Sequence, residues 1–404
     1  MQKKITRRLI AGLTLLLAFA PVLPSVYADG DETEEVQTAE SEELYDLVTE
    51  YEEISVSADA YVVIDMDGGR IIADHNMKSI YRPASTTKIL TALVVLENVD
   101  DLSEKLTFSH DAVATNLTED SSTLTPVAAE GEKMTVRDAL YGMLLSSGNE
   151  CANALAEYVA GSNDAFAKMM NDKAKEIGCR DSHFTNPSGL DDDDHYTTAY
   201  DLALIMMSAM ENPDFLKIDT SAKHTIQATN KCDTTRLCVM GHKMISGEYD
   251  YPGVIAGKTG CTELAGRVLV TVCEKNGSRV LVVIMHADED AFYDDTAALL
   301  DYAYTAIPKM EEAAEIHAKE WETQEEIRSS IEAQIQAATD ASNALESMEN
   351  AQKTNEENGQ NTLSAAEKTR IYIVSIAVGV AILILLGLEL VLYMKLNRKS
   401  VPRL

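Results

Sequence analysis

The chain has 404 residues, of which 46% are hydrophobic, so one large domain or two ordinary ones with a packed core are possible. Acidic residues outnumber basic residues by 66 to 34, and the formal net charge is -32. A surface of that sign repels phosphate, which excludes a nucleic-acid-binding protein.

The first 28 residues have the pattern of a secretory signal peptide. Four basic residues precede an apolar run over 9–20, and residues 26–28 offer a cleavage site. A retained membrane helix is the alternative, but the run is shorter than the ~20 residues that a span needs. Residues 29–58 carry twelve acidic residues and no Lys or Arg, which is typical of a solvated linker.

A folded domain is expected over 59–308, with strands at both ends and helices between them. Two β-hairpins are predicted: 61–64 with 71–73, and 268–272 with 280–285 around Asn276-Gly277. Helices are expected over 85–97, 136–160, 164–177, 198–210 and 294–306, the last ending before Pro308. This order predicts an α/β (α+β) domain in which helices cover a sheet of sequence-distant strands.

A helical or partly disordered stalk is expected over 309–369, which is rich in Glu, Gln, Ala, Asn and Ser. Its apolar residues are spaced for one helical face, but the stripe is thin, and a partner helix or coiled coil stays open. A transmembrane helix is predicted over 370–394, because 371–394 are apolar apart from Glu389. A buried core helix is the alternative there.

The tail over 395–404 carries four basic residues. The positive-inside rule therefore places this tail in the cytoplasm and residues 29–369 outside the cell membrane. Among the six cysteines, Cys232 and Cys238 flank a predicted turn and are either bridged or free. No spacing among the cysteines matches a zinc site.

Three short motifs carry the chemistry. The first, Ser85-Thr86-Thr87-Lys88, opens a predicted helix, so that the hydroxyl and the amine share a helix face. A lysine that burial keeps neutral can activate such a serine as a nucleophile. The others are Ser147-Gly148-Asn149, between helical segments, and Lys258-Thr259-Gly260, expected as a turn before a strand. Each alone is weak, but together, in this order, they form the S-x-x-K, S-x-N and K-T-G set.

With these motifs, the stretch from about 58 to 308 resembles the membrane-anchored D-alanyl-D-alanine carboxypeptidases, the low-molecular-mass penicillin-binding proteins. The segments that carry the resemblance are 82–88, 135–149, 184–190, His195 with 199–203, and 257–266. It implies the β-lactamase/DD-peptidase-like fold with an antiparallel sheet covered by helices. It also implies a peptidoglycan stem peptide ending in D-Ala-D-Ala as substrate, and β-lactam antibiotics as ligands.

The resemblance implies a role for each motif residue. Ser85 attacks the carbonyl of the penultimate D-alanine, and Lys88 is the base. Ser147 relays a proton to the leaving amine, while Asn149 binds the substrate amide and helps to seat Lys88.

On the K-T-G side, Lys258 and Thr259 hold the terminal carboxylate, and Gly260 completes the motif. The N–H groups of Ser85 and Cys261 form the oxyanion hole, and neither a metal nor a cofactor is needed.

Two departures from the family pattern stand out. The β-rich second domain of many relatives is expected to be replaced by the stalk, because 309–369 lack strand alternation. Some relatives have an arginine before the last helix, but 287–295 contain no basic residue. His195 and Asp201 resemble parts of a Ser-His-Asp triad, although a structural role is the favoured interpretation.

Two alternative functions stay open. A serine β-lactamase would need a carboxylate base for deacylation, but no Glu-x-x-Leu-Asn segment occurs between 149 and 258. A catalytically silent wall-binding or β-lactam-sensing protein is the other, and the intact motif residues argue against it.

Overall fold

The computed structural model describes residues 54–357 apart from Asp120, together with residues 364, 369–374, 376, 379, 380, 384 and 387. The predicted signal peptide (1–28), most of the acidic linker (29–58), most of the apolar stretch (370–394) and the basic tail (395–404) lie outside the described residues. Within the described part of the chain, no helix is both long enough and apolar enough to cross a membrane.

A five-stranded antiparallel sheet with the order β2-β1-β9-β8-β7 forms the centre of the domain. Its strands are β1 (Ala60–Asp65), β2 (Arg70–His75), β7 (Val254–Thr262), β8 (Gly266–Lys275) and β9 (Ser278–Ala287). Both predicted hairpins are confirmed. Asn276 and Gly277 join β8 to β9 with φ of 57° and 86°, as a type I′ turn requires.

The predicted helices are present, with shifted boundaries. They are α3 (Lys88–Asn98), α4 (Val136–Leu145), α5 (Asn149–Ala160), α6 (Asn163–Ile177) and α7 (Ala199–Met210). The helix α8 (Pro213–Asp219) follows them and was not predicted. The predicted helix over 136–160 is interrupted at 146–148, which separates α4 from α5. At the start of α4 and α7, the side chains of Thr135 and Thr198 accept backbone N–H bonds three residues ahead.

Short elements complete the domain, and sequence patterns did not indicate them. They are η1 (Ala84–Thr87), β3 (Lys105–Thr107), η2 (Asp111–Thr115), β4 (Lys133–Thr135), β5 (Lys223–Ile226), β6 (Arg236–Val239) and α9 (Lys243–Ser246). The pairs β3–β4 and β5–β6 are two-stranded ribbons. All six cysteines are free, Cys232 and Cys238 included.

The last helix corrects one expectation, because α10 (Phe292–Glu357) continues through Pro308 instead of ending before it. A proline inside a helix removes one N–H donor and costs about 3 kcal/mol. Here Ala303, Ile307 and Met310 are buried on both sides of the proline. Their packing offsets that cost.

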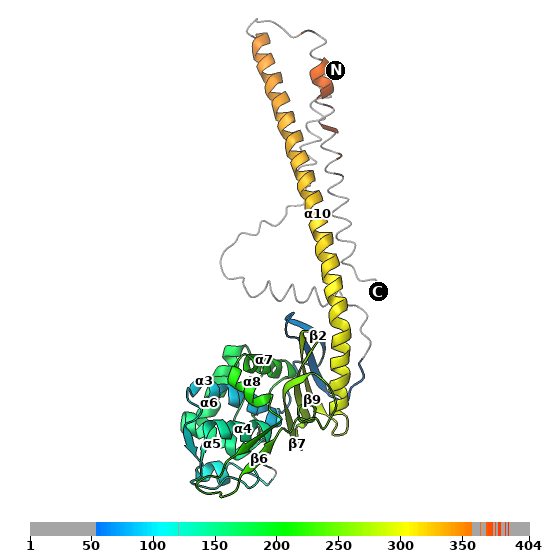
Figure 1. The fold of residues 1–404 in the computed structure, drawn as a ribbon. Helices are drawn as coiled ribbons and strands as arrows, with labels where there is room; N and C mark the ends of the chain where they lie inside the picture. Colours follow the sequence, from blue (N-terminus) through cyan, green and yellow to red (C-terminus); the bar gives the residue numbers. More distant parts are fainter. Residues whose placement is uncertain are drawn as a thin grey trace. The chain divides into compact units, whose positions relative to one another are not determined.

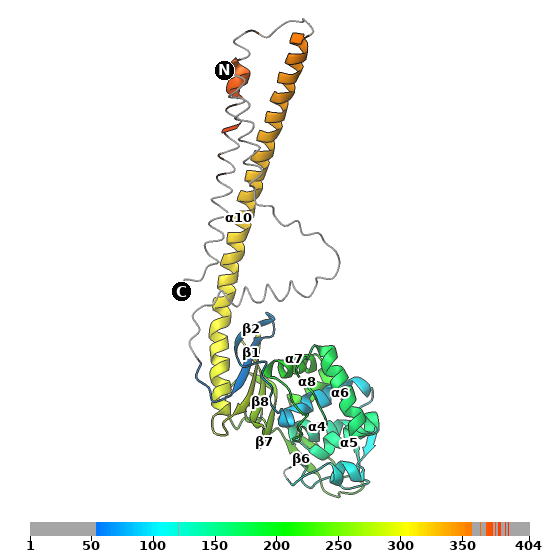
Figure 2. The ribbon, with the colours of Figure 1, turned by 180° about the vertical axis from the view of Figure 1, so that it is seen from behind.

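The sheet lies between the first turns of α10 and the group of helices from α3 to α8 (Figures 1 and 2). Both α7 and α10 contact β1 and β9, while η1 contacts β7 at the end of the sheet. The domain therefore has the expected α/β architecture, with an antiparallel sheet and helices. This arrangement brings the S-x-x-K segment against the strand that carries K-T-G.

Candidate active site

Ser85 lies in η1, directly after a backbone position of unusual conformation. Ala84 is fully buried and has φ of 47°, a left-handed value that costs a non-glycine residue about 1–2 kcal/mol. Gly189 packs against this residue so closely that a Cβ on it would lie 1.8 Å from the Ala84 carbonyl oxygen. The surrounding chain thus fixes the backbone from which Ser85 projects.

Lys88 follows one turn later and is fully buried. Its Nζ donates to Ser85 Oγ at 2.9 Å and to the Ser188 carbonyl at 2.6 Å. Burial lowers the pKa of Lys88 well below its ordinary value, the Lys258 ammonium lowers it further, and the Glu150 carboxylate opposes them. The geometry therefore offers a neutral amine within reach of the Ser85 proton.

Ser147 and Asn149 approach from the break between α4 and α5. Ser147 has φ of 57°, and its Oγ accepts a hydrogen bond of 3.2 Å from Lys258 Nζ. Asn149 is buried at the cavity wall, and its Oδ1 has no hydrogen-bond partner within the described part of the chain. Lys88 Nζ bonds to Ser85 and to the Ser188 carbonyl, so the role of Asn149 in helping to seat Lys88 stays a prediction. The Asn149 amide is left to face the cavity.

Lys258, Thr259, Gly260 and Cys261 lie within β7, not in a turn before a strand, as the sequence had indicated. They form a regular ladder with β8, in which Cys261 pairs with Arg267. A Cβ on Gly260 would lie 2.8 Å from the Pro83 carbonyl oxygen and 3.2 Å from the Ser85 nitrogen. Only glycine permits this close approach of β7 to the nucleophile segment.

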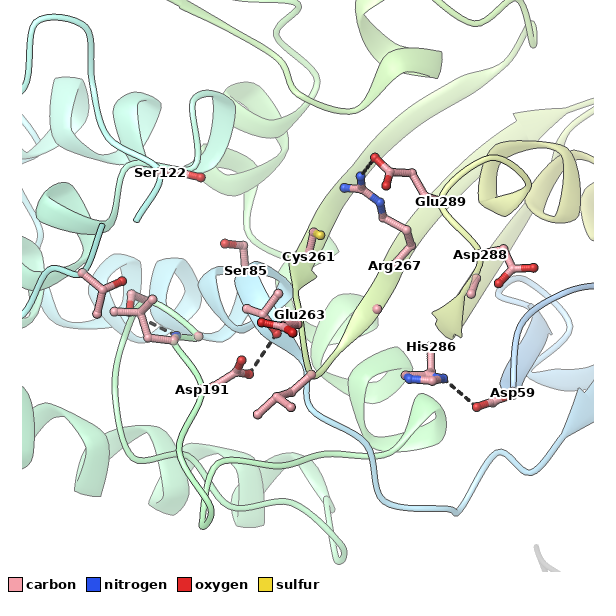
Figure 3. A pocket seen from close by; sticks show the side chains of 18 of the residues that line it. Asp59, Ser85, Ser122, Asp191, Cys261, Glu263, Arg267, His286, Asp288 and Glu289 are labelled. Atoms are coloured by element: carbon pink, nitrogen blue, oxygen red, sulfur yellow. Dashed lines mark hydrogen bonds and ion pairs between the residues drawn. The ribbon is translucent and has the colours of Figure 1, made fainter. Parts of the chain in front are cut away.

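A cavity of about 1070 Å³ opens beside Ser85. Figure 3 shows Ser85 and Cys261 side by side on its wall, with Asp191 and Glu263 at the rim. The Asp191 carboxylate accepts from Thr262 Oγ1 at 2.9 Å, which ties this rim to the end of β7. The cavity thus brings together Ser85 of the S-x-x-K motif, the end of the strand that carries K-T-G, and an acidic border.

Arg267 supplies a cation that the sequence analysis missed on this side of the cavity. It projects from β8 into the lining and pairs with Glu289 (Figure 3). The segment 287–295 lacks a base, but the β7–β8 pairing brings Arg267 beside Cys261. The buried run over 268–273 begins directly after Arg267, but only the pairing of β8 with β7 shows that Arg267 lies opposite Cys261.

His195 and Asp201 do not form a triad with Ser85. Nδ1 of His195 accepts from the Thr185 N–H at 3.0 Å, so its Nε2 carries the proton and donates to Thr87 Oγ1 at 2.9 Å. Burial lowers the pKa of His195 to about 4. Asp201 accepts from the Asp181 N–H and from a serine hydroxyl. Both residues therefore fix the loop that contains Ser188.

Three further residues near the motifs escaped the sequence analysis. Ser188 holds Lys88 through a backbone carbonyl, which no side-chain pattern reveals. Glu150 and Asp219 are fully buried carboxyls whose contacts depend on distant segments. Among the residues that the structure describes, no three His, Cys, Asp or Glu side chains gather as a metal site.

The sequence profile described as D-alanyl-D-alanine carboxypeptidase matches residues 47–289 of the chain. D-alanyl-D-alanine carboxypeptidase DacF of Bacillus subtilis is 30% identical over 307 residues, which cover 75% of this chain and 71% of DacF. D-alanyl-D-alanine carboxypeptidase DacB2 of Mycobacterium tuberculosis is 31% identical over 263 residues, covering 62% of this chain and 84% of DacB2.

Solved structures agree with these relatives. A D-alanyl-D-alanine carboxypeptidase from Mycobacterium tuberculosis superposes with a TM-score of 0.58 at 30% identity, covering 64% of this chain and 95% of that one. The Streptomyces K15 DD-transpeptidase superposes with a TM-score of 0.59 at 25% identity, covering 63% and 100%. The matched profile extends over more than half of the chain and includes all three motifs. The chain therefore belongs to the D-alanyl-D-alanine carboxypeptidase family.

Proposed function

We propose that the protein is a serine-type carboxypeptidase that removes the terminal D-alanine from peptidoglycan stem peptides ending in D-Ala-D-Ala. The observation that carries this function is the 2.9 Å contact between Lys88 Nζ and Ser85 Oγ beside a large cavity. A neutral amine at this distance accepts the serine proton as the hydroxyl oxygen attacks.

In the acylation step, Ser85 Oγ forms an ester bond to the carbonyl carbon of the penultimate D-alanine. The backbone N–H groups of Ser85 and Cys261 stabilise the negative charge on the carbonyl oxygen. The C–N bond then breaks, and the Ser147 hydroxyl relays a proton to the departing amine of D-alanine. The proton that Ser147 passes on is replaced by the one that Lys88 took from Ser85, so Lys88 becomes neutral again, while Lys258 stays charged as the hydrogen-bond donor to Ser147.

Substrate binding uses the other motif residues. The Asn149 amide faces the cavity and bonds to the peptide backbone of the substrate. Lys258 and Thr259 bind the terminal carboxylate, to which an ammonium and a hydroxyl are complementary. In the second step, water attacks the ester carbonyl, the ester bond breaks and Ser85 regains its proton. β-Lactams occupy the same place and acylate Ser85.

Mass spectrometry of the purified protein tests this function. We expect one penicillin adduct per chain on Ser85, and free D-alanine when the substrate is a peptide ending in D-Ala-D-Ala. Rapid loss of the adduct without release of D-alanine would identify a β-lactamase instead. A lasting adduct without D-alanine release would identify a β-lactam sensor, and no reaction with either compound would identify a silent protein.

We further propose that the protein is exported and held in the cell membrane as a single-pass protein, with its catalytic domain outside. The support is in the sequence: 371–394 are long and apolar enough to span about 30 Å of hydrocarbon, and basic residues follow them. An amphipathic surface helix fits badly, because the stretch is apolar on every side. The acidic stalk over 309–369 is repelled by anionic lipid and so projects the domain away from the membrane.

A truncation tests this topology. We expect the chain ending at Thr369 to be released into the medium, with the first 28 residues removed and penicillin binding retained. The full-length chain serves as the control and should stay with the membranes after washing with salt. If the truncated chain also stays there, the anchor lies elsewhere, first of all at an uncleaved N-terminus.

A further inference from the structure

Asp219 is a fully buried carboxyl behind the K-T-G strand. It is the last residue of α8, and its Oδ2 accepts the backbone N–H of Gly257 at 2.7 Å. Its Oδ1 has no hydrogen-bond partner within the described ranges. Gly257 directly precedes Lys258, so Asp219 holds the β7 backbone at the residue next to the lysine.

A buried carboxylate with one unpaired oxygen destabilises a fold unless a nearby cation compensates its charge. Burial raises the pKa of Asp219 to about 7, while the Lys258 ammonium lowers it. Burial lowers the pKa of Lys258 to about 8, and the Asp219 carboxylate opposes that shift. The two groups therefore stabilise each other's charged form in the interior.

The other titratable groups that face Lys258 do not replace Asp219. Lys88 lies on the α3 side, and the two amines disfavour each other's charge. His242 precedes α9, is fully buried and has its pKa lowered to about 3, so it is neutral. Its Nε2 lies 2.8 Å from Thr271 Oγ1. Among these neighbours, only Asp219 provides negative charge to Lys258.

We propose that Asp219 is a positioning residue for Lys258. It fixes β7 through the Gly257 N–H, and its negative charge keeps the buried Lys258 ammonium protonated. This inference rests on the proposed function, in which Lys258 binds the carboxylate of the substrate or of a β-lactam. A charged Lys258 also favours the neutral form of Lys88, so one buried carboxylate supports both lysines.

The variant Asp219→Asn separates charge from backbone positioning. An asparagine Oδ1 still accepts the Gly257 N–H, whereas Asp219→Ala loses both the charge and the hydrogen bond. The measurement is the pH dependence of acylation by penicillin, with saturation constant and limiting rate determined separately. At high pH, acylation weakens as Lys258 loses its proton, and we call this fall the alkaline limb. In Asp219→Asn, we expect the alkaline limb to move at least about one pH unit lower, so that acylation at a pH within this limb is about tenfold weaker than in the parent.

Two controls isolate the carboxylate. The shift should affect the saturation constant, and it should disappear with a penicillin ester that carries no free carboxylate. The matched variant Asp65→Asn removes another buried carboxylate, which accepts from the Gly68 N–H and from Arg70 away from Lys258, and should leave the alkaline limb in place. An unchanged limb in a folded Asp219→Asn protein would overturn the proposal and leave Asp219 a purely structural role.

A direct titration keeps this test independent of activity. The ¹³Cε resonance of Lys258, assigned with Lys258→Arg, should titrate at lower pH in Asp219→Asn than in the parent. If the variant does not fold, the parental resonance decides: it should also respond to a second group that titrates near pH 7, and a single-step curve would refute the coupling. A protein that shows this coupling but releases no D-alanine would refute the proposed function alone.

Discussion

Replacing Ser85 with alanine is expected to abolish covalent labelling by penicillin and to lower the release of D-alanine by roughly a millionfold, as when other serine hydrolases lose their nucleophile. The reason is chemical, because Oγ of Ser85 is the atom that forms the ester bond. Folding should change little. The variant loses one hydrogen bond to Lys88, worth about 1 kcal/mol, and Lys88 keeps its bond to the Ser188 carbonyl.

The matched control is Ser122→Ala. Ser122 lines the same cavity (Figure 3), but the hydrogen bonds of Lys88 among the described residues go to Ser85 and Ser188. This control should label with one penicillin per chain, as the parent does. Thermal unfolding of both variants checks that they fold. One penicillin per chain on folded Ser85→Ala would show that another serine is the nucleophile.

Local patterns predicted much of this fold. The β8–β9 hairpin follows from two β-branched runs around Asn276-Gly277, whose conformations depend only on the turn itself. α6 ends at Gly178, which has φ of 102° and closes the helix as a left-handed cap. Such signals are contained within a few neighbouring residues, so the sequence alone reveals them.

Features that depend on distant segments were not predictable in this way. Two glycines, Gly257 and Gly260, interrupt the strand pattern of β7 at the motif, and its identity as a strand depends on pairing with β8. α10 passes Pro308 because its flanking residues pack on other elements, which local propensity does not contain. Sequence patterns therefore predicted the motif residues, but not the buried residues, such as Ser188 and Asp219, that hold the motif residues in place.

The groups behind the motifs show the same limit. Ser188 acts through a backbone carbonyl 100 positions from Lys88, and Asp219 contacts Gly257 38 positions away. Neither residue type is unusual at its place in the sequence. Their importance arises from burial, which strengthens electrostatic interactions. Only the assembled fold shows which buried charges face each other.

Lys88→Gln is expected to slow acylation by penicillin by about 10²–10⁴-fold, the usual contribution of a general base. Glutamine retains an N–H donor for the Ser188 carbonyl but cannot accept the Ser85 proton at any pH used. In the parent, the rate should rise with pH as Lys88 loses its proton, at a pH well below the ordinary lysine value. This acidic limb should be missing in the variant.

Lys173→Gln provides a matched control, because Lys173 forms ion pairs with Glu97 and Glu176 away from the cavity. Acylation at the parental rate in Lys88→Gln, measured by rapid mixing from pH 5 to 10, would rule out Lys88 as the base.

The thermal stability of Lys88→Gln is a second, independent test of whether Lys88 is a buried neutral base. Because the folded state lowers the pKa of Lys88, the unfolded chain binds its proton more tightly, and this linkage disfavours folding at every pH below the unfolded value of about 10.4. Stability contributed by the neutral amine is thus complete only above that pH and is lost as pH falls toward the folded pKa. Glutamine removes this penalty, so the variant should unfold at a temperature no lower than the parent at pH 7. A position that gains stability while it loses acylation is one that the fold maintains for chemistry.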